Sequence, residues 1–117
     1  MVGFDVDLIK AVGDELGVEV ELIDVPWEEI FNMLNDGEFD VIIDGITITP
    51  ERMDNFLFSV PYLNAGQTIV VRKETNDILK PEDLKDKFVA VLEETTCEAA
   101  AAKHSDNVVT YASQDLV

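Results

Sequence analysis

The chain has 117 residues, 47% of them apolar, and its formal net charge at pH 7 is −17. This length predicts one small domain or part of a larger one, with enough apolar residues for a folded core. The negative charge argues against nucleic acid and anionic membrane surfaces as partners.

Few residues suit metal, redox or covalent chemistry. The single cysteine, Cys97, cannot form an internal disulfide, and one cysteine with one histidine cannot make a zinc cluster. No nucleophile–base pair stands out, so we expect no metal, no cofactor and binding rather than catalysis. No apolar run approaches the roughly 18 residues that span a bilayer, and Met1 leads directly into amphipathic sequence, so we expect no signal peptide here.

The N-terminal part alternates helix and strand patterns. Apolar residues at every fourth position predict a helix over 4–16, capped by Asp5 and ended by Gly17. Alternating apolar and acidic residues then predict a strand over 18–25. A second helix is predicted to open at Pro26 and to end at Asp36-Gly37.

The next strand runs into a loop that carries candidate binding groups. The β-branched run Val41-Ile42-Ile43 predicts a buried parallel strand over 39–46, and Thr49 with Pro50 predicts the start of a helix. Ligands of open α/β sheets bind where such strands end. The loop and the helix start therefore predict a cradle for a small anion, made of Asp44, Gly45, Thr47 and Arg52. The alternative is an ordinary loop with a solvated arginine.

The composition changes after a further predicted strand over 67–72. Residues 73–77 are polar and turn-like, which predicts a crossing between two lobes, 1–72 and 73–117. In the second lobe, the sequence predicts a short helix over 79–84, a buried strand over 87–92 and a helix from Thr95 or Thr96 through Ala102. A strand over 108–111 and a helix from Ser113 are predicted to follow.

This order predicts an α/β fold with a doubly wound, mostly parallel sheet. The helix at the N-terminus has no strand before it, so we expect the pattern to begin inside a longer one. A phospho-receiver domain is also acidic and doubly wound, but the acidic pair expected after its first strand is absent.

Several stretches resemble, in order and spacing, the amino-acid-binding family of periplasmic solute-binding proteins that serve ABC importers. The most specific is Gly45-Ile-Thr-Ile-Thr-Pro-Glu-Arg52. The others are Gly3-Phe-Asp-Val-Asp-Leu8, Pro26-Trp27, Phe39-Asp-Val-Ile-Ile43, Phe58-Ser-Val-Pro-Tyr62, Val70-Val-Arg-Lys73 and Leu84-Lys-Asp-Lys-Phe-Val-Ala-Val91.

The resemblance implies a periplasmic-binding-protein-like fold, in which two lobes close on a ligand by a hinge motion. It implies that Arg52 and Thr47 bind the carboxylate of an amino acid and that the Gly45 carbonyl accepts from its amino group. Thr95 and Thr96 would add donors from the second lobe. Trp27 and Asp44 lie where the family contacts the ligand side chain. The plainer alternatives are that Trp27 is only a core residue, that Asp44 is a solvated loop acid and that the two threonines are ordinary helix caps.

Departures from the family pattern imply a chain truncated at both ends, with the second lobe incomplete. Glu94 stands where the family usually has glycine, and its carboxylate should repel a ligand carboxylate. Unpaired strand edges invite pairing, so we expect a homodimer through exposed or swapped strands.

The expected function is the capture of a small amino acid in the cleft between the lobes, a polar or cationic side chain being slightly favoured. The expected partners are the membrane subunits of an ABC importer, and the expected location is periplasmic or extracellular, with a lipid anchor as an option. The alternatives are a non-binding remnant or sensor module and a dehydratase-like enzyme, for which Asp44 or Glu94 would be the acid–base group.

Overall fold

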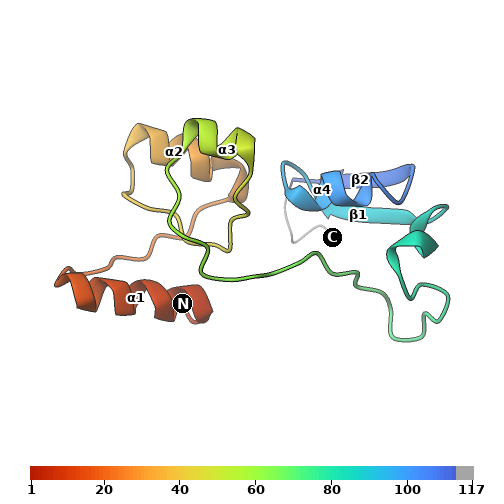
Figure 1. Cartoon of the computed structure of the whole chain (residues 1–117), viewed down its shortest axis with the longest axis horizontal. Helices are drawn as coiled ribbons and strands as arrows, with labels where there is room; N and C mark the ends of the chain where they lie inside the picture. Colours follow the sequence, from red (N-terminus) through yellow and green to blue (C-terminus); the bar gives the residue numbers. More distant parts are fainter. Residues whose placement is uncertain (113–117) are drawn as a thin grey trace. The chain divides into compact units, whose positions relative to one another are not determined.

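A computed structural model of the chain describes residues 1–112, which fall into two compact units: unit 1 is Met1–Leu63 and unit 2 begins at Asn64 (Figure 1). The helix predicted from Ser113 lies outside the described residues. The lobe boundary predicted after Arg72 stays a prediction, because compactness does not locate a hinge.

Unit 1 begins with α1 (Phe4–Leu16), which has the predicted span. Its predicted cap was wrong, because Gly3 precedes the helix without a side-chain cap and Asp5 lies inside the first turn, where a carboxylate favours the helix dipole. Gly17 ends α1 in the left-handed conformation, with φ 70°, as the sequence predicts.

The second predicted helix is split in two. A 3₁₀ turn, η1 (Trp27–Glu29), leads into α2 (Ile30–Asp36), and Gly37 ends α2 with φ 76°. Helix α3 (Pro50–Asn55) follows, where Thr49 Oγ1 accepts a hydrogen bond from the Arg52 N–H at 3.2 Å. Both features of this predicted helix start, the threonine cap and the proline, are confirmed.

The strands predicted over 18–25, 39–46 and 67–72 were wrong as hydrogen-bonded strands. Among the described residues the one ladder is in unit 2, between β1 and β2. In unit 1, residues 18–25 and 39–46 cross between α1 on one side and α2 and α3 on the other (Figure 1). A β-strand is defined by backbone hydrogen bonds to a neighbouring strand, and none of these three segments pairs with another strand among the described residues.

Unit 2 contains η2 (Pro81–Leu84), β1 (Phe88–Leu92), α4 (Thr96–Ala101) and β2 (Asn107–Tyr111). The strands are parallel, in register from Phe88 beside Asn107 to Leu92 beside Tyr111, and α4 connects them. The predicted strands and helix are thus confirmed within one or two residues of their ends. A parallel pair joined through a helix is the basic βαβ unit of an α/β fold.

A small core holds unit 2 together. Leu84, Val91 and Ala101 are buried, one each from η2, β1 and α4. Buried Ser105 donates from Oγ to the Lys87 carbonyl at 2.7 Å and accepts from the Asn107 N–H at 3.0 Å, so one hydroxyl joins the beginnings of both strands. Within residues 1–112, no helix is long and apolar enough to cross a membrane.

Candidate ligand-binding site

Arg52 is the best-positioned charged group of unit 1. The Thr49 cap holds its backbone in the first turn of α3, and its side chain turns back so that Nη1 donates to the Thr47 carbonyl at 3.0 Å. The guanidinium carbon lies 5.6 Å from the centre of the Trp27 ring and 5.3 Å from that of Phe31. Two cation–π contacts and one hydrogen bond therefore orient a half-buried guanidinium.

The two rings form a fixed platform. Trp27 meets Phe31 edge-on, with centroids 5.9 Å apart, and Phe31 packs on Phe56 at 5.0 Å. Each ring is held by a helix. Trp27 lies in η1 and Phe31 in α2, and Phe56, which packs on Phe31, directly follows α3. Trp27 thus contacts the predicted carboxylate-binding residue, while its predicted contact with a ligand side chain stays a prediction.

Gly45 occupies a conformation that suits glycine. Its φ is +55°, in the left-handed region, and its N–H donates to the Tyr62 hydroxyl at 2.9 Å. The Tyr62 ring also stacks on Phe4 of α1, with centroids 6.2 Å apart and an interplanar angle of 18°. Tyr62 therefore fixes the Gly45 turn relative to the start of α1.

Two acidic residues lie beside this turn. Burial raises the pKa of the Asp44 carboxyl above its ordinary 3.8, and the nearby Asp5 carboxylate raises it further. Burial also raises the pKa of Tyr62, against the opposing effect of the Gly45 N–H, and a hydrogen bond with Asp5 adds to the rise. Asp5 and Asp44 thus place two carboxyl groups beside the neutral Tyr62 hydroxyl and Gly45, an arrangement that suits a cation.

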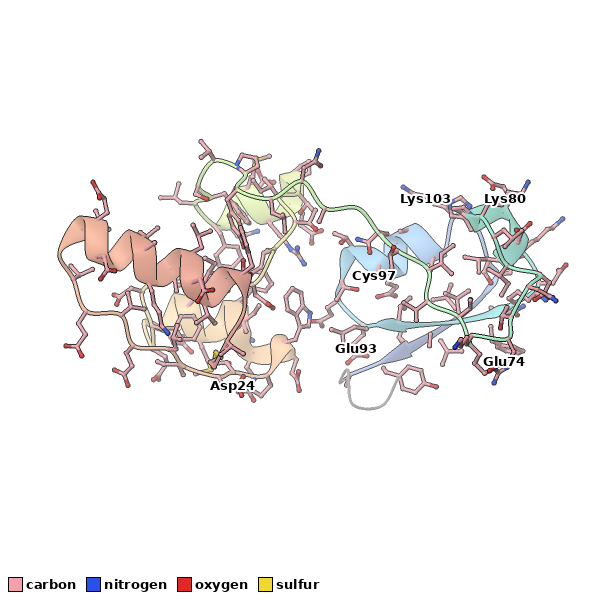
Figure 2. The ribbon with its side chains drawn as sticks, turned by 90° about the horizontal axis from the view of Figure 1, so that it is seen from below. Asp24, Glu74, Lys80, Glu93, Cys97 and Lys103 are labelled. Atoms are coloured by element: carbon pink, nitrogen blue, oxygen red, sulfur yellow. The ribbon has the colours of Figure 1, made fainter. Side chains whose placement is uncertain are left out.

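Thr95 and Thr96 lie in unit 2, at the start of α4. Thr95 is the N-cap residue by position, but its hydroxyl donates to the Leu92 carbonyl at 2.7 Å and makes no cap bond. Thr96 Oγ1 accepts from Gln67 Nε2 at 3.1 Å, and the Sγ of Cys97 (labelled in Figure 2) donates to Gln67 Oε1 at 2.8 Å. The ligand roles predicted for both threonines stay predictions.

Glu94, which precedes these threonines, is in the left-handed conformation with φ 58°. Among the described residues it is the one non-glycine with positive φ. The position is therefore one that glycine satisfies without strain, which gives a physical reason for the glycine that the family pattern has there.

Sequence reasoning did not assign Asp5, Phe31 or Tyr62 to the site. The structure joins all three to it through ring contacts and hydrogen bonds. The spacing of Phe31 in its helix indicates an apolar core position, and this pattern does not reveal its contact with Arg52. Tyr62 belongs to an irregular aromatic stretch within 56–62, and that clustering of rings near a loop was the available signal.

Solved structures resemble the whole described chain. An ancestral arginine-binding protein bound to arginine matches 98% of this chain with a TM-score of 0.88 at 40% identity, over 53% of its own length. An ancestral amino-acid-binding protein, described as a precursor of cyclohexadienyl dehydratase, matches 98% of this chain with a TM-score of 0.87 at 43% identity, again over 53% of its length. The fold is therefore that of amino-acid-binding α/β proteins, as predicted.

Sequence relatives define the family. The arginine-binding extracellular protein ArtP of Bacillus subtilis (strain 168) is 37% identical over 91 residues, which are 78% of this chain and 35% of ArtP. Residues 1–108 match the bacterial extracellular solute-binding proteins, family 3, and the chain belongs to that family. It spans about half the length of the two solved relatives and about a third of ArtP.

Proposed function

We propose that this chain captures an amino acid for an ABC importer and that Arg52 binds the ligand carboxylate. The observation that carries the proposal is the guanidinium seated on Trp27 and Phe31, beside the Gly45–Thr47 turn. A guanidinium presents a planar fork of donors that matches the two oxygens of a carboxylate. In this proposal the Thr47 hydroxyl assists Arg52, and the Gly45 carbonyl accepts from the ligand ammonium group.

The acidic residues favour a polar or cationic ligand side chain. Asp44 lies one residue before Gly45, and Asp5 acts on it electrostatically. A cationic ligand would relieve the repulsion between the two carboxylates and would lower the raised pKa of Asp44. The similarity to arginine-binding proteins supports the same ligand class. We therefore place L-arginine first among the ligands to test.

Isothermal titration calorimetry with three ligands separates the two contacts. L-Arginine has both charged ends, L-glutamine lacks the cationic side chain, and agmatine is arginine without its carboxylate. Arg52→Ala should weaken the affinity for L-arginine roughly 10- to 100-fold. A charged hydrogen bond contributes about 1.5–3 kcal/mol, and each 1.4 kcal/mol changes the dissociation constant about tenfold. Agmatine affinity should then change little. Asp44→Asn should weaken the affinity for arginine and agmatine more than the affinity for glutamine.

Arg72→Ala is the matched control, since Arg72 is exposed and belongs to unit 2. It should bind all three ligands like the parent chain. Equal loss of arginine and agmatine affinity in Arg52→Ala would show that Arg52 does not bind the carboxylate. If the folded parent chain bound none of the twenty common amino acids, the remnant or sensor reading would replace importer capture.

A dehydratase-like activity is the second candidate. It is supported by the raised pKa of Asp44, which would keep this carboxyl protonated to a higher pH and so leave it available as a general acid. A turnover assay with a prephenate-like substrate separates this reading from binding. Product formation that Asp44→Asn abolishes would favour the enzyme.

We also propose self-association through unit 2. In the described sheet, β1 and β2 pair only with each other, so each has an open edge, and Phe88 of β1 is 82% exposed. Open edges pair with other strands. Light scattering should show a dimer, and a strict monomer would refute it. The proposed location is periplasmic or extracellular, and detergent phase partition of the natural protein would test for a lipid anchor.

A further inference from the structure

The Tyr62 hydroxyl joins the Gly45 turn to the first turn of α1. Its oxygen accepts the Gly45 N–H at 2.9 Å, and the same hydroxyl hydrogen-bonds with Asp5, which lies in the first turn of α1. A backbone N–H can only donate, so a lone pair of the hydroxyl faces Gly45 and its proton is directed to Asp5. Asp5 thereby orients the hydroxyl for its bond to the turn.

The Tyr62 ring is held independently of its hydroxyl. It stacks on Phe4 of α1, with centroids 6.2 Å apart and an interplanar angle of 18°. Stacking of two rings does not require a hydroxyl group, so a phenylalanine at this position would keep the ring contact and lose only the two hydrogen bonds. The packing role and the hydrogen-bonding role of Tyr62 can therefore be separated by experiment.

The conformation of the Gly45 turn depends on this hydroxyl. Gly45 has φ +55°, and glycine adopts positive and negative φ about equally, so its own backbone does not select this conformation. Among residues 1–112, no backbone–backbone hydrogen bond involves residues 44–46. A Cβ built on Gly45 would meet nothing within 4 Å, so no neighbour packs closely against that side of the turn. The bond from the Gly45 N–H to Tyr62 is therefore the contact that favours this conformation.

Rotation at Gly45 would redirect its carbonyl group. The N–H and the carbonyl of Gly45 belong to successive peptide planes that meet at its Cα, so a change of φ moves one plane relative to the other. Hydrogen bonds weaken steeply when the donor and the acceptor are poorly aligned. A Gly45 carbonyl that accepts from a ligand is therefore effective only while the turn keeps its conformation.

We propose that Tyr62 is a positioning residue, which aims the Gly45 carbonyl at the ammonium group of an amino-acid ligand. This role rests on the proposed function, in which that carbonyl accepts from the ligand ammonium group. The Tyr62 hydroxyl then helps to select α-amino acids over molecules that are otherwise identical but lack the α-amino group. Tyr62 acts through Gly45, and Asp5 acts through Tyr62.

Isothermal titration calorimetry on the full chain with two ligands tests this role. L-Arginine has the α-amino group, and 5-guanidinopentanoic acid is the same molecule without it. Tyr62→Phe should weaken the affinity for L-arginine roughly two- to tenfold, which corresponds to the net contribution of one ordinary hydrogen bond. The affinity for 5-guanidinopentanoic acid should stay the same, because this ligand has no ammonium group for the Gly45 carbonyl to accept from.

Tyr111→Phe is the matched control, since Tyr111 is the only other tyrosine in the sequence and lies in β2 of unit 2. It should bind both ligands like the parent chain. Hydrogen exchange at the Gly45 amide gives a second measurement, made without ligand. Exchange should be faster in Tyr62→Phe, which lacks the acceptor of this N–H, and unchanged in Tyr111→Phe. Circular dichroism should show both variants folded.

Three results would overturn the role of Tyr62 and leave the proposed function standing. They are an equal loss of affinity for both ligands in Tyr62→Phe, which would make Tyr62 a packing residue, an unchanged affinity for L-arginine, and an unchanged exchange rate of the Gly45 amide. A parent chain that bound both ligands equally, or bound neither, would lack the ammonium contact altogether. The role of Tyr62 would then fall together with the proposed contact of the Gly45 carbonyl.

Discussion

Replacing Gly13 by alanine tests how α1 packs on residues 18–20 of unit 1. Gly13 is buried in the middle of α1, and a Cβ built there would lie 2.4 Å from Val20 Cγ2 and 3.1 Å from the Val18 carbonyl oxygen. Valine is stiff about χ1 and the second neighbour is backbone, so neither yields easily. In an isolated helix the same substitution would be favourable. The sign of the effect therefore reports whether this contact exists.

The magnitude follows from two opposing contributions. Alanine favours a helix over glycine by about 1 kcal/mol, whereas overpacking a tight site costs about 1–3 kcal/mol. Because 2.4 Å is far inside ordinary contact, we expect a net loss of roughly 1–2 kcal/mol in the free energy of unfolding of unit 1. Urea titration followed by circular dichroism measures it, fitted with two transitions if the units unfold separately.

A double-mutant cycle with Val20→Ala isolates the contact. Val20→Ala alone should destabilise, but it removes the methyl group that Cβ would meet, so Gly13→Ala should cost less in that background. A Gly13→Ala variant that is about 1 kcal/mol more stable than the parent, as helix propensity alone predicts, would refute the packing described for residues 18–20.

Three further predictions concern single residues. Ser105→Ala should destabilise unit 2 by about 1–3 kcal/mol in urea titrations, because it leaves the half-buried Asn107 N–H and Lys87 carbonyl without their partner, while Ser59→Ala at an exposed serine should not. Glu94→Gly should raise the free energy of unfolding of unit 2 by roughly 0.5–1 kcal/mol, because the strain of a non-glycine residue in the left-handed conformation, about 1–2 kcal/mol, exceeds the entropic cost of glycine. A loss of stability in this variant would contradict the prediction. Because the folded chain holds the Asp44 proton to a higher pH than the unfolded chain, the Asp44 contribution to stability should fall as pH rises from 3.8 through the raised value, and Asp44→Asn should remove it. A pH series of unfolding titrations that is unchanged by Asp44→Asn would contradict the shift.

The helix ends were predictable because local chemistry determines them. Gly17 and Gly37 take the left-handed conformation that glycine favours, and Thr49 with Pro50 starts α3. These signals act within one turn of the chain, so a sequence read in order contains them. Asp5, which was predicted to cap α1, instead hydrogen-bonds with Tyr62, a residue far from it in sequence.

The lack of strand pairing in unit 1 and the neighbours of Arg52 were not predictable in the same way. Residues 18–25 have the alternation of a strand, but a ladder depends on a partner that no local pattern describes. The platform under Arg52 joins residues of three separate elements, and each of its rings has an equally good explanation as helix core. The polar loop was visible in the sequence, whereas its aromatic support was not.

The contact between Arg52 and Trp27 gives the chain an optical signal of its own. Trp27 is the only tryptophan in the sequence, and a guanidinium lies 5.6 Å from its ring. Indole emission responds to a charge at that distance, so any ligand that draws Arg52 off the ring will change the fluorescence without a label. Occupancy of the arginine can therefore be followed in real time, in a stopped-flow instrument, on the unmodified protein.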